Sequence, residues 1–170
     1  TGSLIKPFSA LFGLKENIIS PSSTVQCRGK ITVEGETFEC WQPSGHGVLN
    51  FYKALAYSCN VYFYHYSHDF PAAGFLEFLR GFGFGQKTGI DLPNEDSGEV
   101  PDSLNALEKA KLVTGSSRRL QITPIQAITA FAAVVNGGKL LKPWLKKGKT
   151  TIRDDINLAP QLPLLHRALQ

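Results

Sequence analysis

A serine and a lysine three residues apart open the 170-residue chain, in the run Thr-Gly-Ser-Leu-Ile-Lys-Pro-Phe. Residues with this spacing share one face of a helix, so the amine of Lys6 can lie beside the hydroxyl of Ser3. Burial and neighbouring charges can lower a lysine pKa until the amine accepts a serine proton. The pair therefore predicts a nucleophile, Ser3, with Lys6 as its base. The alternative is a helix-capping serine followed by a solvated lysine.

A second motif follows at Ser58-Cys59-Asn60. A Ser-x-x-Lys followed by a Ser-x-Asn resembles the motif order of the serine acyltransferases that react with β-lactams. In that resemblance Ser58 relays a proton to the leaving amine, and Asn60 orients Lys6 and the substrate amide. The alternative for this second motif is a polar cap where two helices meet.

Further segments resemble the transpeptidase domains of penicillin-binding proteins, and the resemblance covers roughly positions 1 to 143. The segments that carry it are residues 2–8, 57–64, 82–85, 88–93, 123–126 and 136–139. Cys40-Trp41 together with Gly45-His46-Gly47 narrows the resemblance to the class B, elongation-type (rod-shape) peptidoglycan D,D-transpeptidases.

This resemblance implies an α+β fold of the penicillin-binding/β-lactamase-like type, of which residues 1–170 supply mainly the helical subdomain. The strands of the central sheet are expected to be largely missing, and so is the family's third motif, a Lys-Thr-Gly strand. Lys87-Thr88-Gly89 is not that strand, because it leads directly into residues 90–93, a separate signature in these proteins. We expect a partial transpeptidase domain from a longer protein, impaired as an enzyme on its own.

For the longer protein the resemblance implies a D,D-transpeptidase that crosslinks stem peptides through a serine acyl-enzyme and is acylated by β-lactams. It implies three partners: peptidoglycan stem peptides, β-lactams, and a membrane glycosyltransferase of the elongation machinery. It also implies an extracytoplasmic or periplasmic location, with an inner-membrane anchor outside this sequence. The alternatives are a non-enzymatic zinc-stabilised scaffold, a β-lactam-sensing module and, less favoured, a serine β-lactamase.

The three cysteines of the chain and one histidine form a second candidate site: Cys27, Cys40, His46 and Cys59. Three thiolates and an imidazole are a common tetrahedral zinc set, and four protein ligands would make the site structural. Members of the resembled family can carry zinc beside the active site, some with aspartates where Cys27 and Cys40 stand. Two alternatives remain. A Cys27–Cys40 disulfide suits an extracytoplasmic protein but leaves Cys59 odd and His46 without a role; the other is three buried free thiols.

The charge pattern argues against nucleic acid as a partner. The formal net charge is +4, with basic clusters at Arg118-Arg119 and at Lys146, Lys147, Lys149 and Arg153. No aromatic residues alternate with these clusters, which favours a solvated basic face. No apolar run approaches the length of a membrane span. We expect His65 and His68 at a helix surface, and Trp41 and Trp144 in packing.

Hydrophobic periodicity predicts helices over residues 3–14, from Val48 through 65, over 72–80 and over 123–135, with another beginning near 164. Residues 17–45 read as irregular, with a hairpin within 30–38. Thr123 predicts an N-cap that Gln126 completes as a capping box. The predicted inward face of that helix consists of Ile125, Ile128, Phe131, Ala132 and Val135.

Overall fold

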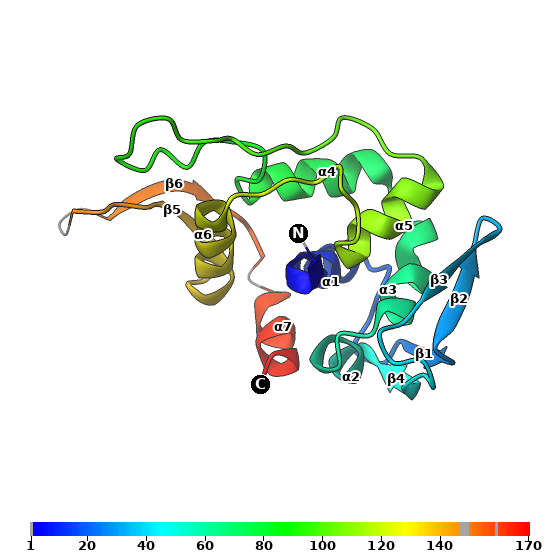
Figure 1. The fold of residues 1–170 in the computed structure, drawn as a ribbon. Helices are drawn as coiled ribbons and strands as arrows, with labels where there is room; N and C mark the ends of the chain where they lie inside the picture. The colour runs from blue at the N-terminus through cyan, green and yellow to red at the C-terminus, as the bar shows by residue number, and fades with distance from the viewer. Residues whose placement is uncertain (1, 147–149, 159) are drawn as a thin grey trace.

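The computed structural model describes residues 2–146, 150–158 and 160–170 (Figure 1). Its helices are η1 (Gly2–Ile5), α1 (Lys6–Lys15), α2 (Phe51–Ala56), α3 (Asn60–Tyr66), η2 (Ser67–Asp69), α4 (Ala72–Gly81), α5 (Ala106–Thr114), α6 (Pro124–Val135) and α7 (Leu162–Ala168). Its strands are β1 (Thr24–Cys27), β2 (Lys30–Val33), β3 (Glu36–Glu39), β4 (Gly47–Asn50), β5 (Lys139–Lys142) and β6 (Thr151–Asp155).

Helix α1 lies at the centre of the helical part and contacts α2, α4, α5 and α7 (Figure 1). It is buried on all sides along nearly its whole length, as expected of a helix with few polar residues. Pro7 stands in the first turn, where a missing backbone N–H costs no intrahelical bond. Ser9 Oγ donates to the Val113 carbonyl at 2.8 Å, which joins α1 to α5. The candidate base, Lys6, therefore belongs to an enclosed helix, and the candidate nucleophile, Ser3, lies on η1 just before it.

Helix α5 fixes the segment that carries Ser3. A capping box between Asn105 and Glu108 begins the helix, and Gly115 ends it in the left-handed conformation at φ 81°. The Gly2 N–H donates to the Gly115 carbonyl at 3.0 Å. A Cβ added at Gly115 would lie 1.7 Å from the Gly2 carbonyl oxygen, so only glycine permits this close approach.

The strands form three separate two-stranded antiparallel sheets in the described part of the chain. The β2–β3 pair is the predicted hairpin, which is thereby confirmed. The prediction of helix from Val48 is wrong: β4 pairs with β1, and Val48 is 64% exposed. The helix begins only at Phe51, because the Asn50 side chain accepts from the Lys53 N–H and acts as the N-cap.

Helix α6 begins as predicted, with Thr123 as N-cap and Gln126 completing the capping box. Its predicted inward face is wrong, because Ile128 and Val135 are 64% and 70% exposed. Gln126 points inward instead and donates to the Ser97 carbonyl at 2.6 Å. This polar contact rotates the helix away from the orientation that hydrophobicity alone favours. Among the described residues, no helix has the length and apolar character needed to cross a lipid bilayer.

Candidate active site

The two sequence motifs meet at the amine of Lys6. Lys6 Nζ donates to the Ser58 carbonyl at 2.7 Å, to Ser58 Oγ at 2.9 Å and to Asn60 Oδ1 at 2.5 Å. Lys6 is only 1% exposed, so these three oxygens replace the water that its amine would otherwise bind. The structure therefore brings three of the four predicted catalytic residues into direct contact.

Ser3, the fourth, lies exposed on η1 immediately before Lys6. A 3₁₀-helix has three residues per turn, so residues at i and i+3 point to the same side. By this rule the Ser3 and Lys6 side chains are expected on one side of the chain, although no hydrogen bond joins these two described residues in this structure. Ser3 is open to solvent while Lys6 is enclosed, an exposure that suits the predicted nucleophile.

Burial lowers the pKa of Lys6 from its usual 10.5 to about 8. Negative charge on Cys40 and Cys59 opposes this shift but does not cancel it. A base works best when its pKa lies near the working pH. An amine in this environment can therefore lose its proton near neutral pH, as a serine-activating base must.

The turn that carries Ser58 has a constrained backbone. Ser58 has φ 50°, in the left-handed region that non-glycine residues rarely adopt. The turn joins α2 to α3, and the Cys59 N–H donates to the Ala54 carbonyl at 2.9 Å. Ser58 and Asn60 face Lys6, whereas Cys59 is buried in a separate cluster with the other cysteines.

All four predicted metal ligands lie together. The candidate ligand atoms of Cys27, Cys40, His46 and Cys59 lie within 4.8 Å of one another. Cys40 Sγ is 3.6 Å from His46 Nδ1 and 4.0 Å from Cys59 Sγ. The three cysteines are free and buried, so the Cys27–Cys40 disulfide alternative is not formed. Gly45 permits this packing, since a Cβ there would meet the Cys27 carbonyl at 2.2 Å.

This donor set fits a zinc ion. Three thiols with one imidazole match the composition of structural zinc sites. His46 Nδ1 contacts Cys40 Sγ, but the buried Nε2 has no hydrogen-bond partner among the described residues, so hydrogen bonding does not fully account for this ring. Burial raises the pKa of Cys59 to about 12. Burial also disfavours the Cys40 thiolate, but backbone hydrogen bonding outweighs it and the pKa of Cys40 falls. A metal ion bound there would favour the thiolate form of both sulfurs.

The Lys87-Thr88-Gly89 segment is not a strand. Thr88 is buried, and its backbone N–H donates to Glu95 Oε1 at 2.6 Å, so residues 87–90 form a fixed loop outside any helix or strand. This contact gives Thr88 a structural role. The loop conformation agrees with the expectation that residues 87–89 are not the Lys-Thr-Gly strand.

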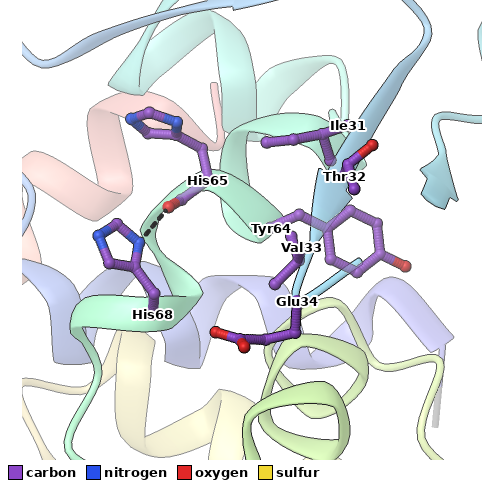
Figure 2. Close-up of a pocket in the computed structure, with 7 residues that line it drawn as sticks. All are labelled: Ile31, Thr32, Val33, Glu34, Tyr64, His65 and His68. Atoms are coloured by element: carbon purple, nitrogen blue, oxygen red, sulfur yellow. Dashed lines mark hydrogen bonds between the residues drawn. The ribbon is translucent and has the colours of Figure 1, made fainter. Parts of the chain in front are cut away.

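A pocket of about 290 Å³, lined by none of the motif residues, lies between β2 and the end of α3 (Figure 2). Figure 2 shows His65 and His68 beside it, and both are exposed, in agreement with the predicted surface position. His68 Nδ1 lies 2.8 Å from the His65 carbonyl, and His68 Nε2 lies 3.0 Å from Asp69. Both ring nitrogens of His68 are therefore engaged. Of the basic cluster near the chain end, Lys147 and Lys149 lie outside the described residues.

Comparison with known proteins identifies the family. A family model described as the penicillin-binding protein transpeptidase domain matches residues 1–163. The peptidoglycan D,D-transpeptidase MrdA of Acinetobacter baumannii is 33% identical over 153 residues, which cover 84% of this chain and 23% of that protein.

Solved structures support the same family assignment. The penicillin-binding protein PBP2 of Helicobacter pylori superposes with a TM-score of 0.90 at 29% identity, covering 98% of this chain and 34% of that one. PBP2 in a complex with MreC from the same organism gives a TM-score of 0.87 at 28% identity, with the same two coverages. This chain therefore spans about a third or less of these relatives. The predicted resemblance to the elongation-type proteins and the mixed helix and small-sheet fold are confirmed, and the chain belongs to the penicillin-binding protein transpeptidase family.

Proposed function

We propose that this chain supplies the Ser-x-x-Lys and Ser-x-Asn part of a peptidoglycan D,D-transpeptidase active site. The observation that carries the proposal is the contact of Lys6 Nζ with both Ser58 Oγ and Asn60 Oδ1, which joins two motifs more than fifty residues apart. A helix cap followed by a solvated lysine does not account for an amine that is buried and held by three oxygens. The named relatives support the same activity.

In the proposed reaction, Ser3 Oγ attacks the carbonyl carbon of a D-Ala-D-Ala bond while its proton passes to Lys6 Nζ. The C–N bond then breaks, and Ser58 relays that proton to the leaving D-alanine amine. Ser3 is left as an ester of the stem peptide. An acceptor amine attacks this ester, the C–O bond breaks, and Ser3 Oγ regains a proton as the crosslink forms. Asn60 keeps Lys6 oriented throughout.

We further propose that the chain is part of a larger transpeptidase domain. It covers 23% to 34% of the relatives described above, and no strand carrying Lys-Thr-Gly stands among the described residues. In the full-length protein such a strand would complete the oxyanion site.

The implied partners are peptidoglycan stem peptides, β-lactams and a membrane glycosyltransferase of the elongation machinery. The implied site of action is periplasmic.

The metal proposal is a structural zinc held by Cys27, Cys40, His46 and Cys59. Four protein ligands leave no open coordination position for substrate or water. The ion would link β1 and the segment after β3 to the Ser58 turn from behind. Its role is to hold the turn, and the acyl-transfer steps belong to the side chains alone.

Covalent labelling of the full-length protein with a fluorescent penicillin tests the proposed function. Ser3→Ala is expected to abolish the adduct, and Lys6→Ala to nearly abolish it, with circular dichroism unchanged. An adduct that persists on Ser3→Ala would place the nucleophile elsewhere. Absence of any adduct on the unaltered protein would favour a non-enzymatic scaffold, and rapid turnover of nitrocefin would favour a β-lactamase.

A further inference from the structure

Trp41 lies beside the active-site turn in an exposed position, contrary to the packing role that we expected. Its side chain is 61% exposed, yet its indole N–H donates to the Tyr57 carbonyl at 2.9 Å. The indole edge also contacts the His46 ring, with 5.1 Å between ring centroids. An exposed tryptophan gains little from burial, so the specific contact with Tyr57 is the feature that needs a function.

The Tyr57 carbonyl, which accepts from Trp41, directly precedes Ser58 along the backbone. Tyr57 is the C-cap of α2, and the last carbonyls of a helix lack intrahelical partners. This carbonyl belongs to the peptide unit that joins Tyr57 to Ser58, and its orientation is linked to the φ of 50° at Ser58. A left-handed non-glycine residue persists only where its surroundings hold it there.

Three consecutive residues hold this turn at three points. The Glu39 carbonyl accepts from Asn60 Nδ2 at 3.3 Å. Cys40 Sγ lies 4.0 Å from Cys59 Sγ. The third contact is the hydrogen bond from the Trp41 indole N–H to the Tyr57 carbonyl. Residues 39–41 therefore contact residues 57–60 at three points, and of these three residues Trp41 is the one that bonds to the peptide preceding Ser58.

We propose that Trp41 is a positioning residue for acyl transfer, because its indole N–H fixes the Tyr57–Ser58 peptide and thereby the place where Ser58 Oγ meets Lys6. The proposal rests on the proposed function. Trp41 acts through Ser58 and needs no contact with the substrate. The hydrogen bond, and not the apolar area of the indole, is the feature that matters.

The test compares Trp41→Phe with Trp144→Phe in the full-length protein. Both changes replace an indole with a phenyl ring. Trp144 is 40% exposed, and Lys142 Nζ lies over its ring, 4.1 Å from the centroid. Trp41→Phe is expected to slow β-lactam acylation about tenfold, the order expected for one hydrogen bond, and to leave the preceding non-covalent affinity unchanged. Trp144→Phe is expected to match the unaltered protein.

Hydrogen-exchange mass spectrometry of residues 57–60 provides a readout that does not depend on activity. Trp41→Phe is expected to speed exchange of the Ser58 and Cys59 amides, which bond to the Leu55 and Ala54 carbonyls. If the unaltered protein forms no acyl-enzyme, the proposed function fails, and the exchange data still judge the role of Trp41 in the turn.

Either of two results would overturn the inference. The first is exchange at residues 57–60 that is the same in Trp41→Phe and Trp144→Phe. The second is faster exchange with an acylation step as fast as in the unaltered protein, since Trp41 would then stabilise the turn without positioning Ser58. A lower melting temperature alone lends no support, because any structural contact could cause it.

Discussion

Lys6 combines two opposing requirements in one side chain. A base must be able to lose its proton near neutral pH, which its burial promotes by lowering the pKa to about 8. A positioned base must also be held, which the three oxygens of Ser58 and Asn60 provide. Negative charge on Cys40 and Cys59 opposes the fall of the Lys6 pKa without cancelling it.

The acylation rate of the full-length protein should therefore rise with pH through about 8, because only the neutral Lys6 amine can accept the Ser3 proton. Below that pKa the amine is protonated, and each lower pH unit should reduce the rate about tenfold. Stopped-flow acylation by a fluorescent penicillin measures the profile. A rate that stays flat from neutral pH upward would show that Lys6 is not the base.

The motif residues were predicted from two short motifs in the right order together with the family that these motifs resemble, since either motif alone occurs by chance in many proteins. Lys6, Ser58 and Asn60 met as expected. Trp41 could not be predicted in this way, since its partner is a backbone carbonyl. That contact exists only because Ser58 adopts a left-handed backbone, which no spacing in the sequence encodes.

At the scale of elements, α5 shows how a helix can be missed. Its apolar residues are too few to give a clear periodic stripe, and we predicted no helix there. The signal was present as Asn105 with Glu108 three residues later, which the structure forms as a capping box. Helix α6 has the same signal and a stronger apolar pattern, and its start was predicted correctly while its buried face was not.

Asn105→Ala should lower the free energy of unfolding by about 1 kcal/mol, the usual cost of removing an N-cap. The loss should loosen α5 and with it the Gly115 contact that holds η1. Denaturant unfolding measures the change. Asn157→Ala is the matched control, since Asn157 is exposed and lies outside any helix or strand. Equal stability of the two variants would contradict the capping role.

Removal of the proposed zinc should lower the melting temperature. The segment from β1 to β4 contributes few buried side chains of its own, so four ligands there would supply folding free energy. Calorimetry with and without a chelator measures the loss, and elemental analysis should find about one zinc per chain. Chelation should leave Cys59→Ser unchanged, because that variant has already lost a ligand. A chelator-insensitive protein with no bound zinc would contradict the metal proposal.

At the scale of the whole molecule, α6 carries large apolar side chains that the described part of the chain leaves exposed. Ile128 and Val135 are exposed although they are seven residues apart on one helix face. Two large apolar side chains in this arrangement are typical of a face that packs against another element. The relatives extend far beyond this chain's span, which agrees with a helical part that is completed by further structure.

Residues 1–170 alone should therefore acylate far more slowly than the full-length protein, even with Ser3, Lys6, Ser58 and Asn60 in place. Loss of one oxyanion donor typically costs about 2.7–4 kcal/mol in transition-state stabilisation, which is a rate loss of about 10²–10³. The expected missing donor is the backbone of a Lys-Thr-Gly strand, since Lys87–Gly89 form a loop held by Glu95. Parallel measurement of acylation by a fluorescent penicillin compares the two proteins, with Ser3→Ala of each as the background. Equal rates would show that the motifs within this chain already form a complete active site, and the proposed partial domain would then be wrong.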